Sequence, residues 1–377
     1  MSRVSSVERR EHPPACGEHP AESREPGAER RFIGWDVGGV NTKVALVAGG
    51  EVRAARGVAF ELQRAPGELP ALLARLAGDV GARDGDAHAV TMTAELSQFF
   101  RTKRDGVRFV LDAVEAAFPG APVHVYAVDG RFLSPDEARR EAIAVAAANW
   151  AATARAVAAR FPDALLLDVG TTTSDVVPIV GGRLAALGRT DPERLASGEL
   201  VYTGALRTPA EAIADAVPLD GGMAGVSAEG FALAGDVHLW RGDLAPADYT
   251  VPTPDGRPAT REFAGERLAR VVCGDRELLD ERAVSAIADA LAEAQVARVA
   301  AAAARVTARH PEIRVAVVTG LGDFVAAAAA RRAGLHVVHL AESLGGDAAR
   351  CAPAAAVALL LLDAAARRPP TSAAVAR

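Results

Sequence analysis

Residues 165–180 read LLLDVGTTTSDVVPIV, and this stretch decides the fold that we expect for the chain. An apolar run ends at Asp168 and Gly170, three threonines follow, and a second apolar run begins at Val176. The pattern predicts a strand, a tight turn and a returning strand. Backbone N–H groups and hydroxyls in such a turn suit a phosphate, and a carboxylate at the strand end can hold a divalent cation beside it.

A near copy of this stretch lies 132 positions earlier in the chain. At equal offsets, one copy has Asp36, Gly38, Thr42 and Val44 where the other has Asp168, Gly170, Ser174 and Val176. Each copy then continues through a Gly-Gly hairpin turn, at residues 49–50 and 181–182, into a third strand. Two equivalent three-stranded meanders therefore predict duplicated lobes that face each other across a central phosphate-binding cleft.

Helical and strand-like patterns alternate along the rest of the chain, which predicts an α/β protein with mixed sheets. We expect a disordered tail at residues 1–30, a first lobe at 31–160, a second lobe at 161–366 and a flexible tail at 367–377. Many glycines and prolines at residues 217–270 predict an insertion or lid in the second lobe. Long helices are expected at residues 135–160, with Ser134 as the N-cap, and at 278–310.

Composition limits the classes of partner. The net charge of −6 gives no reason to expect nucleic-acid binding. The three cysteines lack the paired spacing of a zinc site and imply no disulfide framework, so a reducing compartment is the default. The chain starts with no signal peptide, and no apolar run approaches the roughly 20 residues that span a bilayer. We therefore expect a cytoplasmic protein without a membrane segment, and no pattern fixes its oligomeric state.

Lysine is rare in this chain. Of 42 basic residues, only Lys43 and Lys103 are lysines. A coding bias towards arginine explains the excess of arginine, but lysine is a compact point charge that binds phosphate differently from a planar guanidinium. A site that needs lysine could resist the bias, and chance survival of both residues is the alternative.

The predicted phosphate-binding residues come from three turns. The third turn, TGLGD at residues 319–323, lies between a buried-looking strand and a helix, where N–H groups suit an anion. It lacks the third glycine of a dinucleotide fingerprint, which disfavours an NAD site, and a plain tight turn is its alternative reading. The predicted residues are Gly38, Gly39, Asn41 and Thr42 in the first turn, Gly170, Thr171, Thr172 and Thr173 in the second, and Gly320 and Gly322 in the third.

Charged residues beside these turns are the candidate catalytic and metal-binding groups. Asp36, Asp168 and Asp175 are candidate metal ligands, although Asp175 could equally be a solvated turn residue. Lys43 directly follows the first turn and could reach a β-phosphate or a diphosphate, or could be a surface lysine. Glu95, at the end of a predicted strand, is the best further catalytic carboxylate, or a capping or salt-bridged glutamate.

Longer motifs give a more specific indication. IGWDVGGVNTKVALV, LLLDVGTTTSDVVPIV and VAVVTGLGDFV resemble the two phosphate elements and the adenosine element of the superfamily of sugar kinases, heat-shock chaperones and actin. More narrowly, the chain resembles the hydantoinase A/oxoprolinase family over about residues 32–363. TMTAELSQFFRTKRDGV, VHVYAVDGRFLSP, GELVYTGALRTP and RLARVVCGDRELL are similar to a branch linked to tetrahydromethanopterin-dependent one-carbon transfer, whose archaeal members are methanofuran-biosynthesis synthases.

The resemblance implies two actin-like (ribonuclease H-like) lobes and a transferase. Oxoprolinase-type subunits usually carry Thr and Asp where this chain has Val40 and Lys43, which disfavours ATP-driven amide hydrolysis. The synthase branch implies that the phenol of γ-glutamyltyramine displaces diphosphate from an aminomethylfuran-methyl diphosphate. The partners would thus be a small-molecule diphosphate ester and a phenolic amine. Mg²⁺ or another divalent cation, held through Asp36 and Asp168, would act with Lys43, and Glu95 would be the base.

Two other functions remain open at this stage. The first is an ATP-dependent hydantoinase or oxoprolinase that hydrolyses a cyclic amide, for which ATP would be the cofactor. The second is a non-catalytic, nucleotide-sensing protein of the actin-like superfamily.

Overall fold

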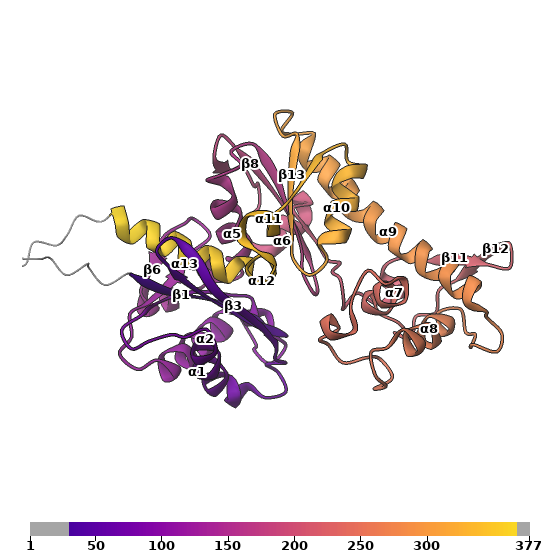
Figure 1. Ribbon diagram of the computed structural model, residues 1–377, viewed down its shortest axis with the longest axis horizontal. Coiled ribbons are helices and arrows are strands. Elements are labelled where there is room, and N and C mark those ends of the chain that lie inside the picture. The colour runs from indigo at the N-terminus through magenta and orange to yellow at the C-terminus, as the bar shows by residue number, and fades with distance from the viewer. Residues whose placement is uncertain (1–29, 368–377) are drawn as a thin grey trace, which may run out of the picture.

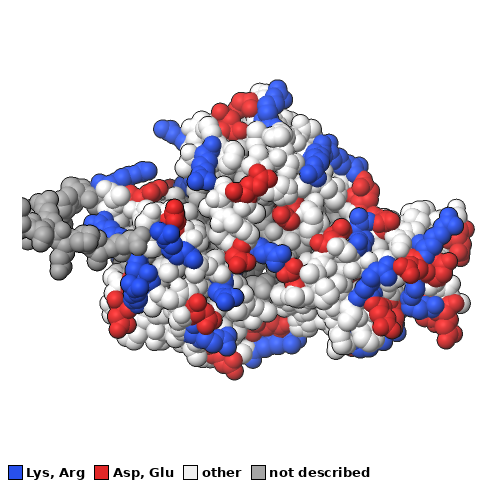
Figure 2. Space-filling model, viewed as in Figure 1, with Lys and Arg blue, Asp and Glu red and all other residues white. Residues whose placement is uncertain are grey.

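The computed structural model describes residues 30–367, and Figure 1 shows two α/β lobes and a largely helical insertion. The disordered tail expected at residues 1–30 lies outside this range except for its last residue, and the tail expected at 367–377 lies outside it except for its first. None of the described helices combines the length and the apolar character needed to cross a bilayer. On the face shown in Figure 2, basic side chains are interspersed with acidic ones over both lobes and the insertion.

The first lobe is built on a mixed sheet with the order β3-β2-β1-β4-β5-β6. Strands β1 (Arg31–Val37), β2 (Asn41–Ala48) and β3 (Glu51–Ala59) form the predicted antiparallel meander. Strands β4 (Ala87–Met92) and β5 (Val123–Tyr126) extend the sheet parallel to β1, and β6 (Phe132–Leu133) closes it. β1 is buried on both faces, so the run from Phe32 to Trp35 is apolar without alternation. One face packs on α1 (Leu69–Asp79) and α2 (Lys103–Ala117).

The second lobe repeats this topology. Strands β7 (Ala164–Val169), β8 (Ser174–Val180) and β9 (Arg183–Leu184) form an antiparallel meander. Strands β13 (Val315–Thr319) and β14 (His336–His339) then follow parallel to β7, and β10 (Leu200–Val201) pairs with the edge of β8. The order β9-β8-β7-β13-β14 matches β3-β2-β1-β4-β5 strand for strand, so the predicted duplicated α/β lobes of the actin-like fold are confirmed.

Two helices join the lobes through a shared core. α5 (Asn149–Ala158) follows the first lobe in sequence but packs on β7, β8 and β9 of the second. α13 (Ala352–Arg367) ends the second lobe but packs on β1, β2 and β4 of the first, as its yellow ribbon shows in Figure 1. The two helices also contact each other. Because each lobe covers its sheet with a helix from the other half of the chain, the two lobes share one apolar core.

The closest approach in this shared core is made by Gly34 on β1. A Cβ atom at this position would lie 1.9 Å from the carbonyl oxygen of Ala354 on α13. We expect Gly34→Ala to lower the free energy of unfolding by about 3 kcal/mol, because α13 must move away from the sheet. Urea denaturation followed by circular dichroism measures this change.

Gly78→Ala is the matched control for this prediction. Gly78 lies in α1 with open space around its Cα, and alanine there should stabilise the helix by about 0.5–1 kcal/mol. Equal midpoints for Gly34→Ala and the wild type would contradict the observed packing of α13 on β1.

The single helix predicted for residues 135–160 is wrong. The chain forms three helices there: α3 (Pro135–Arg140), α4 (Ala142–Val145) and α5. The predicted start is correct, since Ser134 and Glu137 form a capping box. Helical geometry is lost at Glu141, and Ala147 takes a φ of 50°. Tertiary pairing explains the interruption, because the Val128 N–H donates to the Ala144 carbonyl at 2.8 Å in place of a continuous helical ladder.

The insertion lies at the far end of a long helix. The helix predicted at residues 278–310 is confirmed as α9 (Glu281–Thr307), which runs from the second lobe into the insertion (Figure 1). The glycine- and proline-rich stretch forms a hairpin of β11 (Ala216–Leu219) and β12 (Gly222–Gly225), followed by α7 (Ala234–Arg241) and α8 (Arg261–Arg270), with a separate apolar core. The remaining helices are α6 (Asp191–Ser197), α10 (Asp323–Arg332), α11 (Ala341–Leu344) and α12 (Gly346–Arg350), with short 3-10 turns at Pro66–Glu68, Ala94–Leu96, Ala210–Ala212 and Pro246–Asp248.

Candidate active site between the two lobes

The first two predicted phosphate turns are closed by equivalent backbone hydrogen bonds. The Gly38 N–H donates to the Asn41 carbonyl at 3.0 Å, and the Gly170 N–H donates to the Thr173 carbonyl at 2.9 Å. Each bond closes the turn between two antiparallel strands, β1 and β2 in one lobe and β7 and β8 in the other. The two copies of the sequence pattern therefore form the same hydrogen bond at equivalent positions.

The two turns also contact each other across the lobes. The side-chain amide of Asn41 donates to the Thr171 hydroxyl at 3.0 Å. Within residues 30–367, the N–H groups of Gly39, Val40, Thr171 and Thr172 donate to no protein acceptor. Four free N–H groups thus lie on two turns that touch, an arrangement that suits an anion with several phosphoryl oxygens.

Asp36, Lys43 and Asp168 form the charged centre of this site, which we call the interlobe site together with the two turns. Asp36 pairs with Lys43 across the β1–β2 ladder, with 3.4 Å between Oδ2 and Nζ. Burial lowers the pKa of Lys43, but the nearby Asp36 and Asp168 more than offset it, so the lysine stays an ammonium. Burial raises the pKa of Asp168 to about 7, Lys43 opposes the rise, and Asp175 and Asp36 add to it.

These carboxylates suit a magnesium ion. The Oδ1 atom of Asp36 is buried and has no hydrogen-bond partner among the described residues. No three His, Cys, Asp or Glu side chains within residues 30–367 gather in a metal-binding arrangement. Mg²⁺, however, commonly takes only one or two carboxylates and completes its shell with water and substrate phosphates. The unpaired Oδ1 of Asp36 and the buried Asp168 therefore fit such an ion.

The third turn packs directly on the end of β7. Gly320 has a φ of 95°, and a Cβ atom there would lie 2.4 Å from Oδ1 of Asp168. The Gly322 N–H donates to the Val169 carbonyl at 2.8 Å, so it is already engaged within the protein. Both glycines are needed for this close approach. Their predicted phosphate contacts stay a prediction, and the structure shows that they hold the turn against Asp168.

Asp175 is paired with an arginine that the sequence did not single out. Arg194 on α6 is 1% exposed and lies 2.9 Å from Oδ1 of Asp175. Its guanidinium also stacks over Trp150 at 4.1 Å and donates to the Glu199 carbonyl at 2.8 Å. One Asp175 oxygen is therefore engaged by Arg194, and the metal-binding role predicted for Asp175 remains a prediction.

Arg194→Met should leave the buried Asp175 charge without its partner. We expect the free energy of unfolding to fall by about 3 kcal/mol, because removing one member of a buried pair leaves an uncompensated charge. Urea denaturation measures the loss, and Arg194→Met with Asp175→Asn should recover part of it. A stability equal to that of the wild type in the single variant would show that another group balances Asp175.

Glu95 lies beneath a cross-lobe ion pair. Its side chain is fully buried, both carboxylate oxygens lack hydrogen bonds, and Lys103 Nζ lies 3.6 Å away. Burial raises the pKa of Glu95 to about 7, and Lys103 partly opposes this rise. The same ammonium lies 2.6 Å from Asp191 on α6 of the second lobe. Asp191 shares α6 with Arg194, which pairs with Asp175, and Asp175 lies opposite Asp168 in the β7–β8 ladder, so this pair is connected to the interlobe site.

The structure thus brings together Asp36, Lys43, Asp168, Asn41 and Thr171, and places two other predicted residues differently. Thr42 is fully buried at the start of β2, and its hydroxyl has no partner among the described residues. Thr173 contributes a carbonyl oxygen to its turn. The interpretation of the sequence named Lys103 only as one of two rare lysines, without a role, and missed Asp191 and Arg194. Only Lys103 carried a signal, as one of two lysines.

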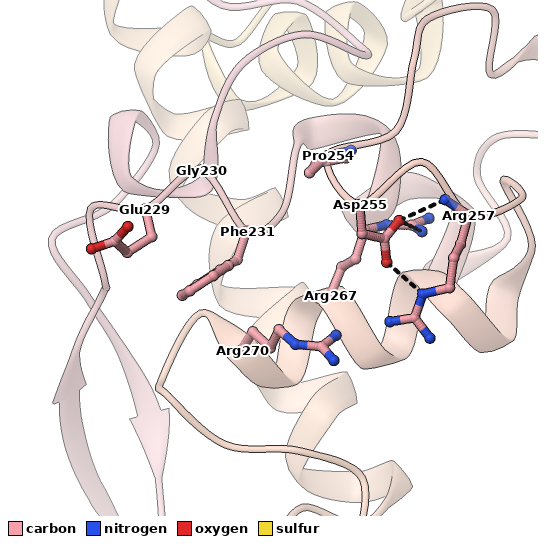
Figure 3. Close-up of a pocket in the computed structure, with 8 residues that line it drawn as sticks. All are labelled: Glu229, Gly230, Phe231, Pro254, Asp255, Arg257, Arg267 and Arg270. Carbon is pink, nitrogen blue, oxygen red and sulfur yellow. Dashed lines mark hydrogen bonds and ion pairs between the residues drawn. The ribbon is translucent and has the colours of Figure 1, made fainter.

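A cavity of about 360 Å³ lies in the insertion, away from the predicted site residues (Figure 3). Two of its arginines are neutralised, since Arg257 pairs with Asp255 and Glu266, and Arg267 pairs with Asp255 and Asp236. These ion pairs join α7, α8 and the loop between them, so they stabilise the insertion. The cavity is lined by Glu229, Gly230, Phe231, Pro254, Asp255, Arg257, Arg267 and Arg270.

Comparison with known proteins agrees with the family resemblance seen in the sequence. Residues 86–364 match the family model described as hydantoinase/oxoprolinase. A protein of Methanocaldococcus jannaschii named (4-{4-[2-(gamma-L-glutamylamino)ethyl]phenoxymethyl}furan-2-yl)methanamine synthase is 34% identical over 327 residues, 86% of this chain and 96% of that protein. A protein of the same name from Methanococcus vannielii is 40% identical over 111 residues, 29% of this chain and 50% of that protein. The nucleotide-free structure of acetone carboxylase is similar in fold, with a TM-score of 0.51, 12% identity, and coverage of 86% of this chain and 70% of that one.

Proposed function

Because the chain belongs to the hydantoinase/oxoprolinase family, we propose that it is an enzyme of methanofuran-type cofactor biosynthesis, serving tetrahydromethanopterin-linked one-carbon metabolism. The phenol of γ-glutamyltyramine would displace diphosphate from an aminomethylfuran-methyl diphosphate. The observation that carries the proposal is 34% identity over 96% of a relative whose printed name describes a phenoxymethyl-furan product. The duplicated phosphate-type turns support a diphosphate leaving group.

The proposed reaction exchanges one carbon–oxygen bond for another. The phenol oxygen bonds to the exocyclic CH₂ of the furan, and the bond from that carbon to the diphosphate oxygen breaks. The diphosphate leaves with the electron pair, and the phenol proton passes to a base. The protein must therefore neutralise a leaving anion and accept one proton.

Residues of the interlobe site suit the first task. The Lys43 ammonium and the free N–H groups of Gly39, Val40, Thr171 and Thr172 can stabilise negative charge on the departing diphosphate. Asp36 and Asp168 would hold a Mg²⁺, and a bound Mg²⁺ supplies further charge neutralisation to phosphoryl oxygens. Lys43 also provides positive charge where an oxoprolinase would carry a carboxylate.

Glu95 suits the second task. A carboxylate with a pKa of about 7 is well matched to proton abstraction at neutral pH, and both Glu95 oxygens are free of hydrogen bonds. The ammonium of Lys103 lies over this carboxylate. The phenol would therefore reach Glu95 only when Lys103 moves aside.

A direct assay tests this function. The protein is incubated with both substrates and Mg²⁺ without ATP, and mass spectrometry should find the ether together with an equal amount of diphosphate. Ether formation only with added ATP would overturn the proposal. So would release of inorganic phosphate that depends on 5-oxoproline or a hydantoin, in the absence of ether.

A cytoplasmic location is part of the proposal, and both described cysteines, Cys273 and Cys351, are free thiols.

A further inference from the structure

Lys103 is held by two carboxylates but is not enclosed by them. Its side chain is 24% exposed, whereas Glu95 beneath it is fully buried and Asp191 opposite it is 18% exposed. We propose that Lys103 is a second diphosphate-binding cation, which leaves Asp191 for a phosphoryl oxygen when the substrate binds. This inference rests on the proposed diphosphate ester as substrate.

The position of Lys103 supports a direct contact with the substrate. It is the first residue of α2, whose N-cap Thr102 accepts a hydrogen bond from the Asp105 N–H. The helix start thus holds the lysine against the second lobe, where Asp191 lies. Asp191 lies on the same helix as Arg194, which contacts Asp175, the ladder partner of Asp168, and a Cβ atom at Gly39 would lie 3.9 Å from Cα of Ala94, the neighbour of Glu95, so this ion pair lies near the interlobe site. A diphosphate has two phosphoryl groups, and the proposal assigns one to Lys43 and the other to Lys103.

The charge balance of the region requires more than one cation. Five carboxylates follow one another through shared contacts in this region and would repel a diphosphate: Asp36, Glu95, Asp168, Asp175 and Asp191. Arg194 is buried and committed to Asp175, so it cannot serve the substrate. Lys43 and Lys103 are both partly exposed, at 28% and 24%, and are the two lysines of an otherwise arginine-based chain. Lysine suits this role because its compact ammonium can change partners.

Moving the Lys103 ammonium to a phosphoryl oxygen has different effects on its two carboxylate partners. Asp191 is partly exposed, so water can solvate its carboxylate once Lys103 leaves. Glu95 is fully buried and loses its nearest positive charge when the ammonium moves away, which strengthens its tendency to take up a proton. Binding of the diphosphate would therefore uncover Glu95 and prepare it to accept the phenol proton.

Two substitutions separate diphosphate binding from a merely structural ion pair. Lys103→Gln and Asp191→Asn both remove the cross-lobe pair, but only Lys103→Gln removes the cation. Calorimetric titration with inorganic diphosphate and Mg²⁺ should show about 10–100-fold weaker binding for Lys103→Gln, the value of a lost charge-assisted hydrogen bond. Asp191→Asn should bind diphosphate as tightly as the wild type or more tightly. Equal weakening in both variants would overturn the inference, because it would assign Lys103 to the ion pair alone.

Arg104→Gln is the matched control for charge. Arg104 is the next residue of α2, and its guanidinium donates to the carbonyls of Arg139 and Arg140 within the first lobe. Its substitution should leave diphosphate affinity unchanged. A weakening equal to that of Lys103→Gln would show a general effect of charge and would overturn the inference.

Chemical labelling tests the wild-type protein without any substitution. Reductive methylation can modify only two side-chain amines, Lys43 and Lys103, with the N-terminal amine as internal reference. Inorganic diphosphate with Mg²⁺ should slow the methylation of both lysines several-fold, as measured by peptide mass spectrometry. Protection of Lys43 alone would overturn the inference.

The outcomes distinguish this inference from the proposed function. Protection of both lysines without ether formation would support the diphosphate site and contradict the transferase. Ether formation with unchanged diphosphate affinity in Lys103→Gln would support the transferase and contradict the role of Lys103.

Discussion

Asp168→Asn should reduce ether formation by a factor on the order of 1,000 while the protein stays folded. Asp168 is the last but one residue of β7 and interacts electrostatically with Lys43, and the third turn packs against it so closely that only glycine fits at position 320. Asparagine keeps the size of the side chain but loses the negative charge that the proposed Mg²⁺ and the Lys43 ammonium require. The measurements are the rate of diphosphate release and the thermal unfolding of the variant.

Asp163→Asn is the matched control, because it makes the same chemical change at the opposite end of β7, away from the interlobe site. Asp163 lies just before β7, and its carboxylate accepts a hydrogen bond from the Gly181 N–H at 2.8 Å. Asp163→Asn can keep this bond and should retain full activity. Unchanged turnover in Asp168→Asn would show that a metal is held elsewhere or is not needed.

Glu95→Gln should lower kcat by a factor of about 100 to 10,000, the usual contribution of a general base. The wild-type activity should rise with pH up to about 7 and then level off, because the pKa of Glu95 is raised to about 7. The charged groups that face Glu95 are Lys103 on α2 and Asp191 on α6. In Glu95→Gln the residual activity should lose the part of this dependence that Glu95 contributes, whereas Asp168, whose pKa is also raised to about 7, keeps its part. A wild-type rate that is flat between pH 5 and pH 8 would exclude Glu95 as the base.

The same substitution should stabilise the protein at high pH. A folded-state pKa above the ordinary glutamate value of 4.5 means that the folded protein binds this proton more tightly than the unfolded chain. The stabilisation from this proton is fully present below about pH 4.5 and is lost as the pH rises through 7. Glu95→Gln should therefore exceed the wild type at pH 8 by up to about 3 kcal/mol, and the gain should disappear near pH 4.

An exposed glutamate provides the comparison for this stability measurement. Glu342 lies on α11 with its side chain exposed, and Glu342→Gln should change stability by less than about 0.5 kcal/mol at either pH. If Glu95→Gln were less stable than the wild type at pH 8, the carboxylate would be stabilising as an anion. Its pair with Lys103 would then outweigh the cost of burial.

Much of the site could be predicted because its parts are local. The Asp-Val-Gly turns at Asp36 and Asp168 follow from short-range chemistry, and their equal spacing to the next strand revealed the duplication. Lys43 follows the first turn directly, so strand pairing alone places it opposite Asp36. The breaks that divide residues 135–160 into three helices could not be predicted. They depend on a hydrogen bond from the Val128 N–H, in a separate segment, to the carbonyl of Ala144.

The sequence by itself determined the two meanders, their phosphate-type turns and the family, since each depends on residues that are close in the chain. Only the tertiary structure decided which charges meet. Lys103 and Asp191 are 88 positions apart, and no local pattern connects them. They meet because α5 and α13 each pack on the sheet of the opposite lobe and join the two halves in one core. The stretch around Asp168 supplies one of the two turns of the interlobe site, and the packing of the lobes brings the turn around Asp36 against it.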